Sequence, residues 1–130
     1  MTPLVSVALL GILTSASPAE DPRPVTAAEA LKQVGKPEVL VEMVVRKAKD
    51  RIDKRGIVYL DSEADFKDPN NLGVALSAAV AARLRQSRAT ALEAYFQGKT
   101  IRVRGCVMRF EERAYLPVLD PAQIQIVGTR

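Results

Sequence analysis

The chain has 130 residues, of which 48% are hydrophobic and 26% are charged, as expected for a single globular domain. It contains no histidine and one cysteine, which excludes Ser-His-Asp and Cys-His catalytic sites, His-ligated metal centres and an internal disulfide. The formal net charge of +4 permits a polyanionic partner but does not require one.

The first 19 residues have the pattern of a secretory signal peptide. The uncharged apolar run over 4–13 is too short to span a bilayer, which takes about 20 residues, and Ser17-Pro18-Ala19 fits the small-x-small rule of signal peptidase. We expect cleavage after Ala19 and a secreted or periplasmic protein; the alternative is a buried N-terminal element. Two prolines in 20–25 predict a linker, which leaves 26–128 as the folded domain.

Short helices and strands are expected in a defined order along this domain. Thr26 and Glu29 form a capping box that begins a helix, and Gly35 ends it. Alternating apolar residues predict strands, with Val39, Val41, Met43 and Val45 on one face of the first, and an alanine-rich segment predicts a helix. The expected strands are 39–46, 56–60, 72–77, 100–104 and 115–119, the helix is 78–88, and a helical turn spans 92–96.

Five short strands with a helix between the third and fourth are the arrangement of the OB-fold, a small Greek-key barrel. The sequence therefore predicts a mainly β protein with a five-stranded barrel. Gly105 predicts a bulge or bend in the fourth strand, and Pro117 requires an edge or unpaired position in the fifth. Cys106 is expected to be buried, with intermolecular pairing as the alternative.

Four segments of the chain resemble small secreted bacterial single-domain OB-fold proteins. The likeness is carried by the pattern FxGKxIxVxG, which begins at Phe96, and by DPxQIxI, which begins at Asp120. The segments are 34–36, 58–63, 94–105 and 119–124, and the resemblance extends over about 26–127. It implies an OB-fold; OB-fold proteins bind single-stranded nucleic acids, oligosaccharides or proteins, and the resemblance does not select among these ligands.

Positive charge is concentrated in two segments. Residues 46–55 hold six cations and two anions and are expected in the loop between the first two strands, whereas 99–113 hold five cations and two anions. In an OB-fold these loops flank the ligand face, so they are expected to form a groove that follows a phosphate backbone beside stacking aromatic residues. The candidate polyanion-binding residues are Arg46, Lys47, Lys49, Arg51, Lys54, Arg55, Tyr59, Arg102, Arg104, Arg109, Phe110 and Arg113, with Tyr115 as a third aromatic candidate.

A structural interpretation of the same residues is also open. Charged runs in hairpin loops are usually solvated, Asp50 and Asp53 are suited to pairing within the run, and the aromatic residues are suited to the core. The acidic segment 61–68, with a net charge of −3, is expected to be a solvated loop or to pair with a basic loop. It fails as a calcium loop because Phe66 stands where glycine is needed and Leu72 where the bidentate glutamate is needed.

The expected function is binding rather than catalysis. The chain has no glycine-rich phosphate loop, no GxSxG and no HExxH, and no metal or cofactor is expected. The leading hypothesis is weak, sequence-independent binding of a polyanion such as single-stranded nucleic acid. The alternative is an envelope interaction module that binds a protein partner or an oligosaccharide.

Overall fold

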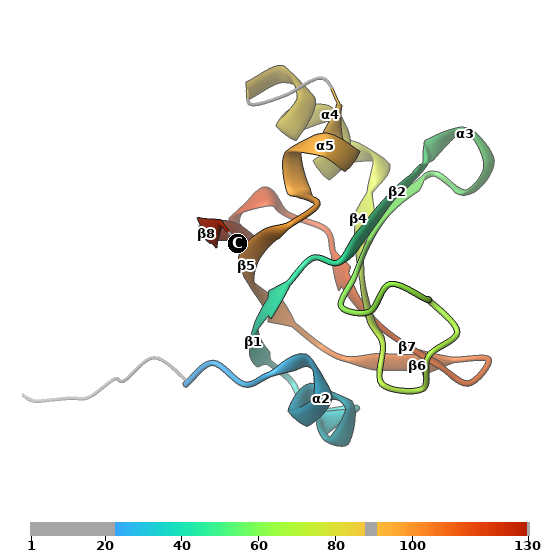
Figure 1. Ribbon diagram of the computed structural model, residues 1–130, viewed down its shortest axis with the longest axis vertical. Coiled ribbons are helices and arrows are strands. Elements are labelled where there is room, and N and C mark those ends of the chain that lie inside the picture. The colour runs from blue at the N-terminus through green and yellow to red at the C-terminus, as the bar shows by residue number, and fades with distance from the viewer. Residues whose placement is uncertain (1–22, 88–90, 130) are drawn as a thin grey trace, which may run out of the picture.

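The computed structural model describes residues 23–87 and 91–129 and shows a mainly β protein with a few short helices (Figure 1). The first sheet has the order β1-β5-β8, and the second has the order β2-β3-β4-β7-β6. All neighbouring strands are antiparallel except β4 and β7, which are parallel. The strands are β1 (Val39–Val44), β2 (Lys47–Arg51), β3 (Ile57–Asp61), β4 (Leu72–Ser77), β5 (Lys99–Gly105), β6 (Met108–Phe110), β7 (Arg113–Val118) and β8 (Ile124–Thr129).

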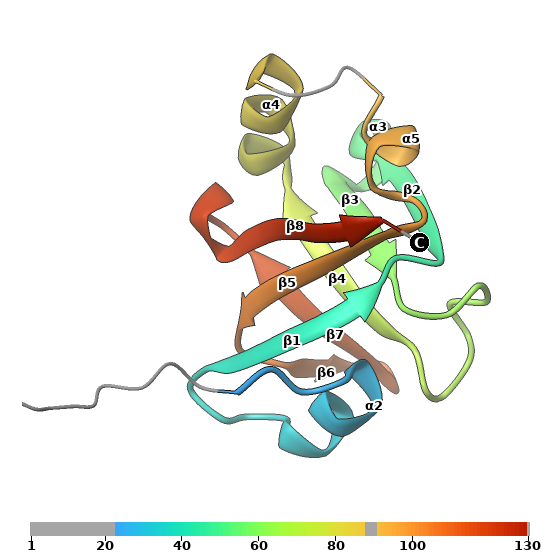
Figure 2. The same ribbon diagram turned by 60° about the vertical axis from the view of Figure 1, so that its left-hand side comes forward.

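The helices lie at the two ends of the sheets (Figure 2). Thr26 caps α2 as predicted: its Oγ1 accepts from the Glu29 amide at 3.1 Å, and Glu29 Oε1 accepts from the Thr26 amide at 2.9 Å. No helix of the described residues is long and apolar enough to cross a membrane. The helices are α2 (Ala27–Ala30), η3 (Leu31–Gln33), α3 (Ile52–Arg55), α4 (Ala78–Ser87), α5 (Leu92–Phe96) and η4 (Pro121–Gln123).

The predicted signal peptide lies outside the described residues, so cleavage after Ala19 stays a prediction. The end of the predicted linker pairs with the fold: the Val25 amide donates to the Leu40 carbonyl at 2.8 Å, and the Glu42 amide donates to the Val25 carbonyl at 2.9 Å. These bonds form a parallel bridge beside β1. The ordered domain therefore includes at least the last residue of the linker.

The hydrogen-bonded ladders form two sheets and do not close into the single barrel that the sequence predicts (Figure 2). The chain bends where it passes from one sheet to the other. The Val45 amide still donates to the Lys99 carbonyl beside β5, whereas the next amide, of Arg46, donates to the Asp61 carbonyl of β3. The chain crosses back to the second sheet at 106–107, between β5 and β6.

The core lies between the two sheets and is built by their alternating apolar residues. Val39, Val41, Met43 and Val45 are buried on one face of the first predicted strand, which confirms that prediction. Side chains from α4 and α5 join the same cluster, with Phe96 among the largest that are fully buried. The periodicity of the sequence thus identifies the inward face of both sheets.

The prediction that 46–55 form a loop is wrong, because Lys47–Arg51 is strand β2 and only 52–55 form a turn, α3. β2 pairs with β3 in antiparallel register, and its central Ala48 is buried. Charged residues dominate this strand because β2 is at the edge of its sheet, where one side and one face remain near solvent. Gly56, at φ +70°, ends α3.

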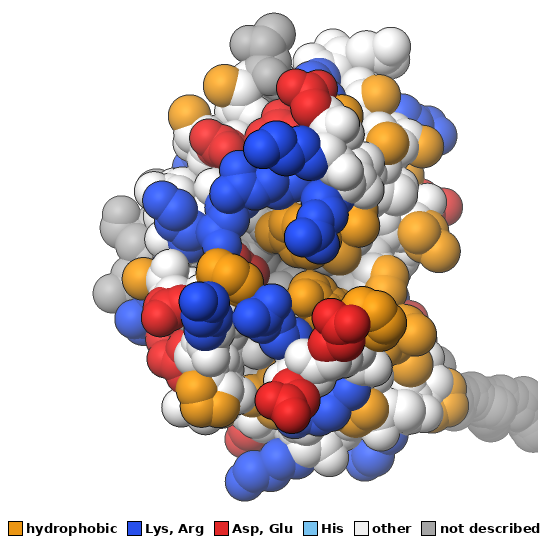
Figure 3. All heavy atoms as spheres, turned by 90° about the vertical axis from the view of Figure 1, so that its right-hand side faces the viewer, with side chains coloured by type: hydrophobic (Ala, Val, Ile, Leu, Met, Phe, Trp, Pro, Cys, Tyr) orange, Lys and Arg blue, Asp and Glu red, His pale blue; other side chains and the backbone are white. Residues whose placement is uncertain are grey.

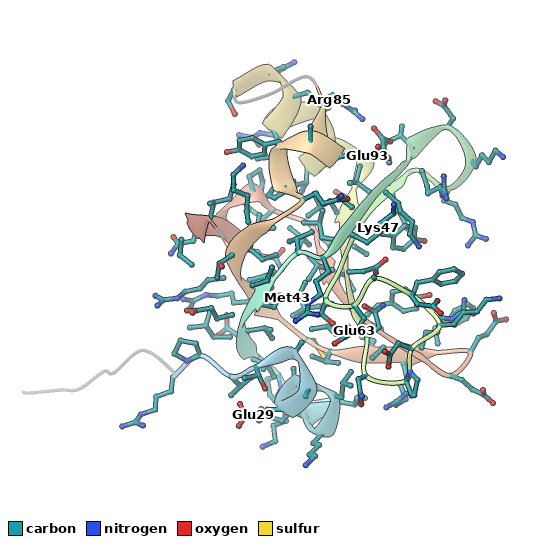
Figure 4. All side chains as sticks on the ribbon, viewed as in Figure 1. Glu29, Met43, Lys47, Glu63, Arg85 and Glu93 are labelled. Carbon is teal, nitrogen blue, oxygen red and sulfur yellow. The ribbon has the colours of Figure 1, made fainter. Side chains whose placement is uncertain are left out.

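Side chains from α4 and α5 satisfy the open edge of β2 (Figure 4). The Ala48 amide donates to Gln97 Oε1 at 3.0 Å, and the Asp50 amide donates to Glu93 Oε2 at 2.7 Å. Arg85 of α4 forms an ion pair with the Asp50 carboxylate. Asp50 is therefore paired, as expected, but with a cation outside the basic run.

The C-terminal part of the chain has more strands than predicted, since three-residue β6 pairs with β7 and β8 pairs with the free side of β5. Pro117 lies beyond the end of the β6–β7 ladder, so no ladder bond to β6 is required there. Cys106 is half-buried rather than buried, because it lies in the crossover between β5 and β6.

Gly105 ends β5 at a point where a side chain has no room. A Cβ added there would lie 2.8 Å from Leu116 Cδ2 and 3.1 Å from Gln123 Nε2. We expect Gly105→Ala to lower the free energy of unfolding by about 1–3 kcal/mol through overpacking, measured by urea denaturation. Gly128→Ala is the matched control, since its Cβ would meet nothing closer than Thr100 Cβ at 3.9 Å. Equal losses in both variants would contradict this explanation.

Candidate functional site

The outer face of the second sheet carries the site. Val58 and Leu60 of β3 point into the core, so the intervening Tyr59 and the following Asp61 point outward. Asp61 is opposite Gly73 of β4, and Gly73 is opposite Tyr115 of β7. The alternation of three neighbouring strands thus brings a carboxylate and two tyrosines to one surface.

This surface is hollowed into an open cavity of about 260 Å³. Lys and Arg side chains gather around the hollow, and hydrophobic side chains are visible within it (Figure 3). The cavity combines cations, aromatic rings and one buried acid. Its lining residues are Lys49, Arg51, Arg55, Tyr59, Asp61, Phe66, Asn71, Arg113, Ala114 and Tyr115.

Three aromatic rings form walls of the cavity. Tyr59 and Tyr115 are half-buried, with their ring centroids 6.1 Å apart and tilted by 49°. Phe66 comes from the loop between β3 and β4 and is 38% exposed. The Lys49 ammonium lies 4.0 Å from its ring centroid, and the Arg113 guanidinium carbon lies 4.5 Å from it. The loop ring is thus held by cations from two strands.

Asp61 is the buried acid of the cavity. Its Oδ1 accepts from Asn71 Nδ2 at 3.2 Å, while Oδ2 has no hydrogen-bond partner among the described residues. The Lys49 ammonium lies 3.5 Å from Oδ2 and forms an ion pair with it. Burial raises the pKa of the Asp61 carboxyl, and Asn71 and Lys49 oppose that shift only in part.

The acidic segment is therefore not wholly the solvated loop that the sequence predicts. Asp61 and Ser62 are buried, because Asp61 ends β3 and Asn71 ties the two ends of the loop together. Asn71 Oδ1 accepts from the Glu63 amide at 2.9 Å, and Ser62 Oγ accepts from the Leu72 amide at 2.9 Å. The Lys49–Asp61 pair confirms the alternative expectation that this segment pairs with the basic run.

The raised pKa of Asp61 makes its charge a cost to folding at neutral pH. The folded state binds this proton more tightly than the unfolded state, so the contribution of Asp61 to stability is best below its ordinary pKa of 3.8 and falls as pH rises through the folded value. We expect Asp61→Asn, which keeps the bond from Asn71, to unfold at a higher temperature than the wild type at pH 7. The gain shrinks towards pH 3.5 in a series of thermal melts. Asp65→Asn, at an exposed position, should show no such gain.

Of the predicted site residues, the structure gathers five in the cavity: Lys49, Arg51, Arg55, Tyr59 and Arg113. The others lie elsewhere. Exposed residues next to the cavity-lining positions of the same run, or on β6, are Arg46, Lys47, Lys54, Arg109 and Phe110. Phe110 is 65% exposed and does not line the cavity.

Arg102 and Arg104 belong to the first sheet and line a separate hollow with Gln123. Arg102 Nε donates to Glu42 Oε1 at 2.7 Å, and Arg104 Nη1 lies 3.8 Å from Glu38 Oε2. The two basic segments of the sequence therefore meet in one cavity only through Arg113, which joins Arg51 and Arg55 there.

Sequence reasoning does not find Asp61, Phe66 and Asn71 as site residues. Asp61 is two positions after Tyr59, so strand parity alone places both side chains on one face. Gly73, which alternates with core residues, is the further signal of a surface left open. Phe66 and Asn71 lie in and at the end of an aperiodic loop, and no local pattern indicates which way such residues face.

Comparisons with known proteins establish the fold alone. No protein-family model and no curated protein matches the sequence. The chain resembles part of a solved structure described as that of an aspartyl-tRNA synthetase from Leishmania major Friedlin, with 12% sequence identity and a TM-score of 0.51. The match covers 92% of this chain and 23% of the other, so this chain spans about a quarter of the protein that it resembles.

Proposed function

We propose that this domain binds single-stranded nucleic acid, without catalysis, in the cavity on the outer face of the second sheet. One observation carries the proposal: two tyrosines and Phe66 line the same cavity as Arg51, Arg55 and Arg113. Among the described residues, these three arginines form no ion pair. They remain available to an anion, whereas Lys49 is held by Asp61.

We also infer that the two sheets are the parts of one partly open OB-type barrel. Strands that follow one another along a bent chain, β1 with β2 and β5 with β6, act as single long strands shared by both sheets. The parallel β4–β7 pair and the likeness in fold to part of a tRNA synthetase structure support this inference. In such a barrel, the second and third strands, here β3 and β4, carry the ligand face.

The chemistry of the cavity suits a nucleotide strand. Every base has a π-face that stacks on tyrosine, so aromatic walls bind bases with little dependence on sequence. Arginine pairs with phosphate oxygens and stays charged at all physiological pH values. A cavity of about 260 Å³ accommodates one or two bases, while the rim arginines contact the adjoining phosphates.

Salt dependence tests this proposal directly. If Arg51, Arg55 and Arg113 each neutralise one phosphate, the logarithm of the association constant falls with the logarithm of salt concentration with a slope of about −2 for a single strand. Fluorescence anisotropy of a labelled dT12 oligonucleotide between 50 and 300 mM NaCl measures this slope. Affinity that salt does not change, or tighter binding of an uncharged oligosaccharide, would favour the envelope-module alternative.

A further inference from the structure

We propose that Asp61 makes the cavity selective for bases that carry an amino group, so that it binds cytosine and adenine in preference to uracil and thymine. The inference rests on the proposed function and names the base chemistry that the same site prefers. It is independent of the arginine–phosphate contacts, which do not distinguish bases.

The state of the Asp61 carboxylate is the first step of the argument. Its side chain is 4% exposed, and one oxygen is occupied by Asn71. The other oxygen, Oδ2, has no hydrogen-bond donor among the described residues, and the Lys49 ammonium beside it at 3.5 Å forms no hydrogen bond. A buried acceptor without a donor is uncommon in folded proteins, and here it belongs to a side chain that lines the cavity.

The second step is the space around that oxygen. Position 73 forms the floor between Asp61 and Tyr115, and a Cβ there would lie 3.2 Å from Asp61 Oδ1 and 3.3 Å from Tyr115 Cδ1. The floor is open because residue 73 is glycine. A base that stacks on Tyr115 therefore presents its edge towards the Asp61 carboxylate.

The third step is the chemistry of the base edge. An ionised carboxylate only accepts hydrogen bonds, so it pairs with the N4 amino group of cytosine or the N6 amino group of adenine and repels the O4 carbonyl of uracil or thymine. The amino group takes the place of the Lys49 ammonium at Oδ2. Lys49 then turns to the adjoining phosphate, so its charge is still paired in the complex.

Octamers of deoxycytidine and deoxyuridine form the matched pair of ligands, because they differ only at the base edge. At pH 8 we expect the wild-type protein to bind dC8 about tenfold more tightly than dU8, as for one hydrogen bond to a charged group. In Asp61→Asn, whose side chain both donates and accepts, the ratio falls to within about twofold. Asp65→Asn makes the same change of charge at an exposed position and keeps the wild-type ratio.

A ligand-side variant tests the proposal without any change in the protein. Replacing the cytosines of dC8 with 2-pyrimidinone removes only the amino group, and we expect wild-type affinity to fall to that for dU8. Equal binding of dC8, dU8 and the 2-pyrimidinone octamer, or an unchanged ratio in Asp61→Asn, would overturn base selection while the proposed function stands. Failure of all three octamers to bind would overturn the proposed function and base selection together.

Discussion

Reversal of the three cavity arginines, in the variant Arg51→Glu/Arg55→Glu/Arg113→Glu, is expected to weaken binding of a dT12 oligonucleotide by roughly 100-fold or more at 100 mM NaCl. Each substitution removes a charge-assisted contact to phosphate and adds a carboxylate that repels it. These arginines form no ion pair among the described residues, so their loss breaks no internal bridge there. Fluorescence anisotropy gives the affinity, and circular dichroism checks the fold.

A second triple variant separates the placement of charge from its total. Lys32→Glu/Lys36→Glu/Arg83→Glu reverses three exposed cations that do not line the cavity. Both variants take the net charge from +4 to −2, because each reversal removes two units. We expect the control to lose less than about fivefold, since charges farther than a Debye length of about 10 Å from the ligand are screened. Equal losses would show that overall charge, and not the cavity, governs binding.

The elements that the sequence predicts correctly are those with a local cause. The capping box at Thr26, the two-residue alternation from Val39 to Val45 and the alanine-rich helix from Ala78 each depend on residues within one turn or one strand. Tertiary packing then uses these local preferences without opposing them. Mainly β architecture with short helices therefore follows from the sequence alone.

The basic run shows where local reasoning fails. Lys47–Arg51 has little of the apolar pattern of a strand, yet it forms β2. Its stability comes from β3 on one side and from Glu93 and Gln97 on the other, more than 40 residues away in sequence. A partner that distant leaves no mark on the run itself, so the charges suggest a loop.

The candidate site divides in the same way. The basic character of the site and the outward position of Tyr59 follow from charge counting and strand parity. The separation of Arg102 from the cavity does not, because it depends on the change of sheet between β5 and β6. Burial of Asp61 likewise depends on Asn71, which closes the loop ten residues later.

The aromatic walls allow the second large effect to be tested. Tyr59→Leu/Tyr115→Leu is expected to weaken binding of dT12 at least tenfold, because stacking of a base on an aromatic side chain contributes about 1–3 kcal/mol. Leucine keeps an apolar side chain on these half-buried positions, so the sheet is retained while the ring surface is lost. Titration at fixed salt measures the affinity, and the salt slope stays at the wild-type value because the phosphate contacts are unchanged.

Two controls connect this loss to stacking in the cavity. Tyr59→Phe/Tyr115→Phe keeps both rings and removes only the hydroxyls, so it should bind within about twofold of the wild type if the π-faces carry the interaction. Phe110→Leu removes an aromatic ring that is 65% exposed on β6 but does not line the cavity, and it should bind as the wild type does. A loss in Phe110→Leu as large as in the double leucine variant would place the bases along β6. Wild-type affinity in the double leucine variant would leave the arginines as the only determinants and would reduce the cavity to a binding site for phosphate.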